Sequence, residues 1–269
     1  MAGMLSHAVA GMALAMACAI APAQAQSISS DVAKLLAPTG TLRVGVLMVW
    51  YFALEDKASG KLEGVIPDLG RELARRAGVT AELGKLENPG AVMAAFRNNA
   101  LDVTFIGITA DRAEVMQYGP TVIDLQTTYL VPAASKIASI AEIDQPGLRI
   151  LVPQRSAQEA HLRKIITKAT LINVAVENPK QAVELIAAGQ ADAFSHVVPM
   201  LASAQPALPG SRILPGSYFN VPVAVAVAKD RPPAVADAAR AFVEEAKASG
   251  FVQQAIARAG VPGVVVAAP

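Results

Sequence analysis

The chain has 269 residues, of which 53% are hydrophobic and 17% charged, and its formal net charge at pH 7 is +1. This composition suits one large or two small globular units with an ample core. Charges of both signs are interspersed, which excludes the strongly basic pattern typical of nucleic-acid or anionic-membrane partners. Three histidines and one cysteine, with no pair at metal-ligand spacing, predict neither a metal site nor a cofactor.

The N-terminal segment predicts export. Residues 8–21 are almost wholly apolar, and Ala23-Gln24-Ala25 forms a small-x-small cleavage site. The apolar run is too short to span a bilayer. We therefore expect a signal peptide over residues 1–25, a mature chain starting near Gln26 and a periplasmic location. Cys18 lies inside this peptide, so the mature protein would have no thiol; lipidation of Cys18 is the alternative.

Predicted strands and helices then alternate. Thr41–Leu47 alternates and then becomes continuously apolar, which is typical of a strand covered on both faces. A helix is expected to open at Pro67, with Asp68 as its N-cap. Residues 79–86 predict a second strand, and Asn88 caps the helix that follows it.

Three adjacent aromatic residues, Trp50, Tyr51 and Phe52, follow the first strand in a chain with few aromatics. Aromatic side chains beyond a strand end can form the wall of a ligand pocket. They can equally plug the core at the edge of a lobe. The sequence leaves both interpretations open.

A buried strand, a turn and a short helix are predicted within residues 98–120. Residues 103–106 are rich in β-branched and aromatic side chains, and Gly107 ends the strand. Thr109 is expected to cap a short helix, and Pro120 is expected to end whatever follows it.

This short helix carries Arg112. In open α/β sheets, ligands bind beyond the carboxyl ends of the strands. Arg112 therefore lies where a guanidinium could hold a ligand carboxylate with two parallel hydrogen bonds. The alternative is a surface arginine paired with Asp111 or Glu114.

An internal repeat indicates two lobes of similar architecture. Residues 87–89 (Glu-Asn-Pro) recur at 177–179, and in both copies an aspartate, Asp102 or Asp192, stands thirteen positions after the proline and opens an apolar strand. The strands that open the two halves also correspond: Gly40-Thr-Leu-Arg-Val and Gly147-Leu-Arg-Ile.

In the second half, residues 156–159 (Ser-Ala-Gln-Glu) form a capping box at a helix start whose free N–H groups could bind an anion or carbonyl. A plain well-capped helix is the alternative. His196 lies in an apolar strand, where a histidine is more often a core residue than a ligand. Residues 223–227 predict a strand that returns to the first lobe's sheet, and residues 251–259 a final helix.

From Gly40 to about Gly260 the chain resembles the solute-binding proteins of ABC importers of the family 3, polar amino acid-binding type. The resemblance is carried by the following segments: residues 40–46, 60–64 with Asp68-Leu69, 101–103, 109–112 and 191–193. It implies the two-lobed α/β fold of type II periplasmic binding proteins, with two hinge strands near residues 128–131 and 220–223 and a ligand cleft between the lobes. Lobe 1 would comprise residues 26–131 and 222–269, and lobe 2 residues 132–221.

The resemblance also implies a ligand site. Arg112 would clamp the ligand carboxylate, helped by its own loop, while the helix start of the second lobe contributes from the other side and an aromatic residue packs on the ligand. The complete candidate set is Trp50, Tyr51, Phe52, Gly107, Thr109, Arg112, Arg155, Ser156, Ala157 and His196.

Three departures from the family pattern bear on the ligand. Gly107 replaces a hydroxyl residue, and Arg155 replaces a glycine before the second-lobe helix. His196 and Val197 stand where an acidic residue usually holds the ligand ammonium. A small organic acid therefore becomes a better candidate ligand than an α-amino acid. The alternative is that Arg155 points to solvent and that another acid, such as Glu55 or Asp56, receives the ligand ammonium.

The sequence thus predicts an exported, monomeric solute-binding protein that serves the membrane permease of an ABC importer. It contains no nucleophile elbow, phosphate-binding loop or dinucleotide fingerprint. Two alternatives remain: an exported enzyme similar to cyclohexadienyl dehydratases, which use carboxylates in the cleft, and an accessory role beside a periplasmic dehydrogenase or sensor kinase.

Overall fold

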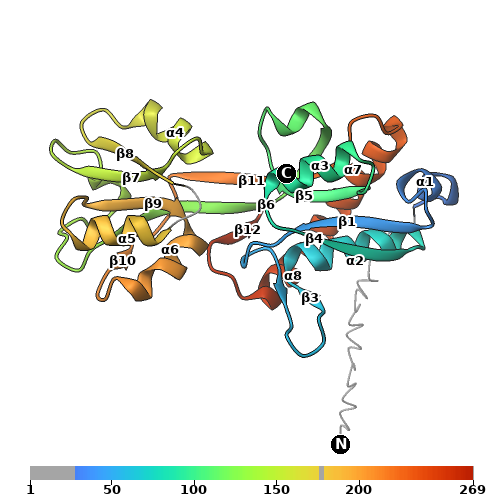
Figure 1. The fold of residues 1–269 in the computed structure, drawn as a ribbon, viewed down its shortest axis with the longest axis horizontal. Helices are drawn as coiled ribbons and strands as arrows, with labels where there is room; N and C mark the ends of the chain where they lie inside the picture. Colours follow the sequence, from blue (N-terminus) through green and yellow to red (C-terminus); the bar gives the residue numbers. More distant parts are fainter. Residues whose placement is uncertain (1–27, 176–178, 269) are drawn as a thin grey trace, which may run out of the picture.

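The computed structural model describes residues 28–175 and 179–268, so the predicted signal peptide and Cys18 lie outside the described residues. Two α/β lobes lie side by side and are joined by the long strands β6 (Met116–Val131) and β11 (Phe219–Ala228) (Figure 1). The two-lobed α/β fold expected from the sequence is confirmed.

The strands of both lobes form one sheet, in the order β4-β1-β5-β11-β6-β9-β7-β8. On each side of the β11–β6 pair lie three parallel strands, with the strand that opens the lobe in the middle. These are β1 (Thr41–Leu47), β4 (Thr80–Leu86) and β5 (Val103–Gly107) in lobe 1, and β7 (Arg149–Pro153), β8 (Thr170–Val174) and β9 (Ala193–Val197) in lobe 2. This correspondence confirms the repeat.

Helices cover the sheet in both lobes. They are α1 (Ser30–Leu36), α2 (Val65–Ala77), α3 (Pro89–Arg97), α7 (Pro233–Ala248) and α8 (Phe251–Ala259) in lobe 1, and α4 (Ala157–Ile165), α5 (Pro179–Ala187) and α6 (Val198–Ala204) in lobe 2. The largest apolar cluster joins buried residues from 33–125 and 223–264 with Val197, while two smaller clusters lie within residues 129–214. Each lobe therefore has its own core.

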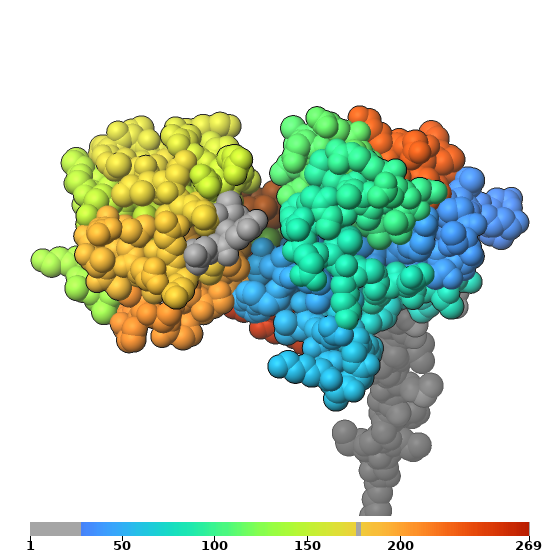
Figure 2. Space-filling view, viewed as in Figure 1, coloured from blue at the N-terminus to red at the C-terminus, as the bar shows by residue number. Residues whose placement is uncertain are grey.

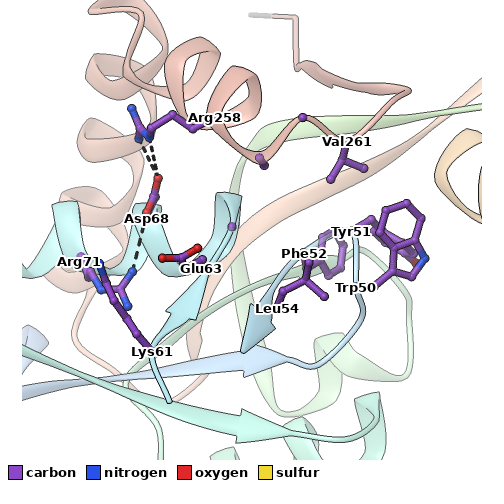
Figure 3. Close-up of a pocket in the computed structure, with 13 residues that line it drawn as sticks. Trp50, Tyr51, Phe52, Leu54, Lys61, Glu63, Asp68, Arg71, Arg258 and Val261 are labelled. Carbon is purple, nitrogen blue, oxygen red and sulfur yellow. Dashed lines mark hydrogen bonds and ion pairs between the residues drawn. The ribbon is translucent and has the colours of Figure 1, made fainter. Parts of the chain in front are cut away.

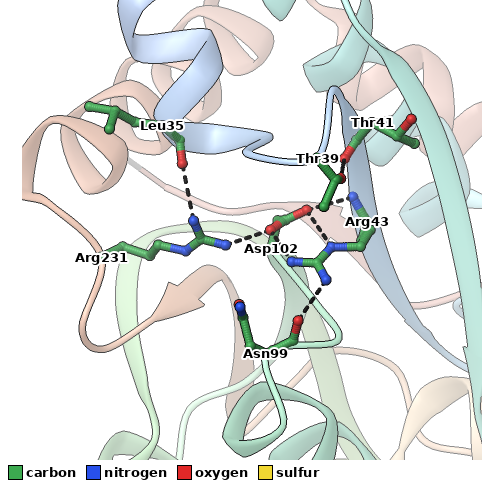
Figure 4. Close-up of polar contacts among 7 residues, drawn as sticks. All are labelled: Leu35, Thr39, Thr41, Arg43, Asn99, Asp102 and Arg231. Carbon is green, nitrogen blue, oxygen red and sulfur yellow. Dashed lines mark hydrogen bonds and ion pairs between the residues drawn. The ribbon is translucent and has the colours of Figure 1, made fainter.

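An arginine–aspartate contact occurs at the same place in each lobe. In lobe 1, the Arg43 backbone N–H and Nε donate to Asp102 Oδ2 at 2.9 and 3.0 Å, and Nη2 donates to Oδ1 at 2.8 Å (Figure 4). The same three groups of Arg149 donate to Asp192 at 2.9, 2.9 and 3.0 Å. Each pair joins the first strand of its lobe to the residue before the third strand. Such charge-assisted, bidentate contacts fix geometry well.

The lobe-1 copy of this contact has one more partner. Arg231, which follows β11, donates to Asp102 Oδ1, and its Nη1 also donates to the Leu35 carbonyl at 3.2 Å (Figure 4). The Asp102 side chain is fully buried, whereas that of Asp192 is 32% exposed. Asp102 therefore also anchors the segment that returns from lobe 2.

Three expected element ends are wrong. Thr109 does not cap the short helix Arg112–Glu114, because Asp111 stands at its N-cap position and no side chain caps it. Pro120 does not end its segment but lies inside β6, between Tyr118 and Thr121, where the pairing with β11 shifts register. A proline is tolerated there because a bulge needs no ladder N–H from it. Asp68 is not an N-cap: α2 starts earlier, after Gly64 at φ +128°, so Asp68 falls in the first turn. The return of β11 to the lobe-1 sheet is confirmed by its pairing with β5.

A C-terminal strand, β12 (Val264–Val266), was not predicted. It pairs with β6 residues 123–125, and the N–H of Gln126 donates to the Gly263 carbonyl at 2.8 Å. Gly263 lies directly against Val198, the first residue of α6 in lobe 2, because a Cβ placed on Gly263 would come within 2.3 Å of the Val198 Cβ. The chain end therefore contacts both lobes where they join.

Alanine at Gly263 should destabilise the protein more than alanine at Gly260. Both glycines have positive φ, +72° and +62°, so alanine strains the backbone at either position. Only at position 263 does the new Cβ also meet Val198, and such overpacking costs about 1–3 kcal/mol. Urea denaturation of the two variants measures the difference; equal losses of stability would show that the contact relaxes at no cost.

Candidate ligand site between the lobes

The carboxyl ends of the strands in both lobes point towards the junction. Gly107, the last residue of β5, pairs with Val223 of β11. Val197, the last residue of β9, pairs with Thr127 of β6, which in turn pairs with Phe219 of β11. Measured along β11, the two strand ends are four residues, or about 13 Å, apart. Figure 2 shows the lobes as two masses with a groove between them.

Arg112 lies on the lobe-1 side, in the short helix η1 (Arg112–Glu114) beyond β5. Its Nη1 donates to the Gly107 carbonyl at 2.6 Å, and its buried Nε has no protein partner. Among the described residues no ion pair joins Arg112 to Asp111, Glu114 or any other carboxylate. The guanidinium is thus held by a backbone carbonyl while one donor stays unpaired. The neighbouring Thr109 hydroxyl, and after it the charge of Arg112, lowers the pKa of Asp111. The alternative of a surface arginine beside Asp111 therefore stays open.

Tyr118 of β6 organises the same loop, which the sequence did not reveal. Its hydroxyl lies 3.3 Å from the Gly107 carbonyl, to which it donates, and accepts the Thr109 N–H at 3.3 Å. The Thr109 amide is therefore already used within the protein. No sequence pattern links Tyr118 to this loop, since the contact depends on how the chain returns after β5 to start β6 on the far side of β11.

On the lobe-2 side, Ser156 caps α4. Its Oγ accepts the Glu159 N–H at 3.0 Å and donates to the Pro153 carbonyl at 2.6 Å. The Glu159 carboxylate accepts a hydrogen bond from the N–H of Arg155. A standard capping box would use the N–H of the N-cap residue Ser156 instead, one residue later. Its hydrogen bond with Arg163 holds the pKa of Glu159 below its usual range. Ala157, the exposed first residue of α4, completes a well-fixed helix start beyond β7.

Arg155 has φ +55°, in the left-handed region that favours glycine. The family glycine at this position thus has a conformational reason, and this chain places a cationic side chain there despite the strain. The Arg155 side chain is exposed and has no ion-pair partner within the described parts of the chain.

His196 is a buried residue of β9. Its Nδ1 accepts the Val197 N–H at 2.8 Å, while Nε2 has no partner. Burial lowers the pKa of His196 to about 4. The imidazole is therefore neutral at pH 7 and adds no positive charge to the groove.

The aromatic trio lines a cavity of its own. Trp50, Tyr51 and Phe52 line a cavity of about 430 Å³ on lobe 1, bounded by the hairpin of β2 (Leu54–Glu55) and β3 (Leu62–Glu63) and by the end of α8 (Figure 3). None of the other seven candidate residues lines this cavity. Phe52 is also part of the lobe-1 core. The structure therefore does not bring the trio and Arg112 together in one enclosed pocket.

A ring stack at the junction is a second feature that the sequence did not suggest. His161 of α4 lies over Phe219 of β11, with ring centroids 4.7 Å apart, and beside Tyr218 at 5.9 Å. Tyr218 in turn stacks on Tyr129 at 4.9 Å. The stack ties α4, and with it the Ser156 helix start, to the strand that joins the lobes.

Within residues 28–175 and 179–268, no group of three or more His, Cys, Asp or Glu residues is placed to hold a metal ion. None of the helices in these residues has the length and apolar character that a membrane span requires.

Residues 42–259 match the family described as bacterial extracellular solute-binding proteins, family 3. The chain belongs to this family. None of the curated proteins matches the chain.

Solved structures show the same type II periplasmic-binding-protein fold. One is the ancestral amino acid-binding protein AncCDT-1, described as a precursor of cyclohexadienyl dehydratase. It is 22% identical, the match covers 86% of this chain and 99% of that chain, and the TM-score is 0.61. Another is the amino acid ABC transporter substrate-binding protein AbpA of Streptococcus pneumoniae, bound to L-arginine. It is 19% identical, the match covers 84% of this chain and 97% of that chain, and the TM-score is 0.60. A third is the periplasmic VFT2 domain of Bordetella pertussis BvgS. It is 16% identical, the match covers 87% of this chain and 99% of that chain, and the TM-score is 0.68.

The pKa of His196 predicts a specific pH dependence of stability. The folded-state pKa of about 4 lies below the unfolded value of 6.5, so only the unfolded chain binds this proton between those pH values. The free energy of unfolding should therefore fall by up to about 3 kcal/mol between pH 6.5 and pH 4 through this group, at about 1.4 kcal/mol per pKa unit.

His196→Asn keeps an acceptor for the Val197 N–H but cannot titrate. Urea denaturation across this pH range should give a flatter curve for His196→Asn than for the parent protein. Parallel curves would show that His196 is accessible to protons in the folded state.

Proposed function

We propose that this protein is an exported solute-binding protein that captures a small carboxylate-bearing solute between its lobes and delivers it to the permease of an ABC importer. Membership of family 3 supports solute capture. The observation that supports the carboxylate is Arg112, which lies beyond the carboxyl end of β5; its Nε lacks a hydrogen-bond partner and it forms no ion pair in the described structure.

An anionic solute fits this groove better than a zwitterionic amino acid. A buried ammonium needs an anionic partner, and at the usual acidic position this chain has the neutral His196. Arg155 adds an unpaired cation before α4 in the opposite lobe. We therefore propose a small organic acid, such as a dicarboxylate, whose binding weakens as salt screens the attraction.

A thermal-shift panel tests the solute class. Organic acids should raise the melting temperature of the mature protein, and Arg112→Ala should remove this rise. Neutral or cationic amino acids should cause no rise that depends on Arg112. Stabilisation by amino acids through Arg112, with none by organic acids, would contradict the anion proposal.

A dehydratase-like enzyme is the second candidate, because AncCDT-1 is described as a precursor of cyclohexadienyl dehydratase. That likeness, at 22% identity, concerns the fold alone. Incubation with prephenate or arogenate distinguishes the two functions: a binding protein gives saturable binding without product, whereas product formation would establish the enzyme.

Arg112→Ala should nearly abolish binding of the organic acid while the fold survives. Loss of one partner from a desolvated charge pair costs roughly 2–5 kcal/mol of binding free energy. The exposed Arg97 of α3 provides a matched control, since Arg97→Ala removes the same charge from lobe 1. Calorimetry that finds Arg112→Ala within a few-fold of Arg97→Ala would remove Arg112 from the site.

Arg155→Gly should separate stability from affinity. Glycine adopts φ +55° without strain, so this variant should be more stable than the parent by about 1 kcal/mol. The same variant should bind the organic acid more weakly, because it loses the lobe-2 cation. Arg155→Ala loses the same charge but keeps the strain, so it should show the lower affinity without the gain in stability, as measured by calorimetry and urea denaturation.

A further inference from the structure

The cavity on lobe 1 has an apolar side and a charged side. Trp50, Tyr51 and Phe52 form the apolar side, with Tyr51 and Phe52 edge to face at a centroid distance of 4.8 Å (Figure 3). At about 430 Å³, the cavity lies within the range of about 300–1,000 Å³ typical of small-molecule sites.

Some charges of the cavity already neutralise one another. Asp68 accepts hydrogen bonds from Arg258 at 2.7 and 3.2 Å and lies 3.7 Å from Arg71 (Figure 3). Arg71 also donates to the Leu62 carbonyl at 2.6 Å. These three side chains form one wall, in which two arginines share one aspartate, so it keeps one net positive charge.

Lys61 and Glu63 are different, because both line the cavity and neither side chain has a partner in the described structure. They flank Leu62, whose side chain is buried, so both point to the same face of β3. One unpaired cation and one unpaired anion thus stand two residues apart beside an apolar wall.

We infer that this cavity is a second binding site, which takes a zwitterionic α-amino acid with an apolar or aromatic side chain. Lys61 would bind the ligand carboxylate, Glu63 its ammonium, and the wall of Tyr51 and Phe52 its side chain. The inference goes beyond the proposed function, because Arg112 does not line the cavity. In this cavity Glu63 would be the acidic partner for the ligand ammonium. The groove lacks such a partner, because His196 stands at the usual acidic position there.

The protein carries its own reporter for this site. Trp50 is the single tryptophan of the sequence and lines the cavity. Titration of the mature protein with L-phenylalanine should change the tryptophan fluorescence in a saturable manner. 3-Phenylpropanoate, which lacks the ammonium, and phenethylamine, which lacks the carboxylate, should each bind about tenfold more weakly, as expected for loss of one charge-assisted hydrogen bond.

Variants identify the residues involved. Glu63→Gln and Lys61→Gln should each weaken L-phenylalanine binding about tenfold, whereas Lys57→Gln, in the same hairpin but outside the cavity, should not. Arg112→Ala should leave the titration unchanged. Because Lys61 and Glu63 are exposed, these variants should fold as the parent does.

Three results would overturn the inference: no saturable change with L-phenylalanine, equal binding of 3-phenylpropanoate, or loss of the signal in Arg112→Ala. The last would place the amino acid in the groove and contradict the anion proposal as well. Failure of the first kind leaves the proposed function unaffected, since calorimetry with organic acids tests the groove separately.

Discussion

The pairing of β6 with β11 is the constraint on which the rest of the structure depends. These strands run through both lobes, and their register sets the ends of β5 and β9 on the two sides of one junction. Arg112 and the Ser156 helix start therefore lie beyond strand ends that meet at one junction, without any direct contact between their loops being required. At the junction β6 exchanges one partner strand for another, while each lobe keeps its own core.

Within each lobe, an arginine–aspartate pair holds the strands that carry the site. The pair joins β1 to the start of β5 in lobe 1, and β7 to the start of β9 in lobe 2. Asp102 is the more constrained copy, because Arg231 adds a third attachment and closes the carboxylate off from water. Removing one partner of a buried charge pair is far more costly than removing an exposed pair. Lobe 1 is therefore the more firmly fixed of the two.

Local patterns were sufficient to predict most of the fold. Sequence patterns marked five of the six parallel strands but missed β8, and the matched positions of Asp102 and Asp192 predicted two similar lobes. What the sequence missed depends on distant pairing: β12 is only three residues long and becomes a strand because β6 offers it an edge. The prediction that Pro120 ends its segment was wrong for the same reason, since only the register with β11 shows that it falls in a bulge.

The candidate site was predictable in part. Arg112 could be placed beyond the end of β5 because strand and loop are adjacent in sequence. The aromatic trio follows β1 just as closely, yet it lines a lobe-1 cavity, because the β2–β3 hairpin and α8 enclose it there. Tyr118 and His161 reach the site from β6 and α4 through contacts that no spacing reveals.

The central claim is that a solute held by Arg112 draws the two lobes together. Small-angle X-ray scattering of the mature protein, with and without a saturating organic acid, tests this most directly. We expect a smaller radius of gyration in the presence of the solute, as the groove closes around it. A solute that binds with calorimetric saturation but leaves the radius of gyration unchanged would contradict capture between the lobes.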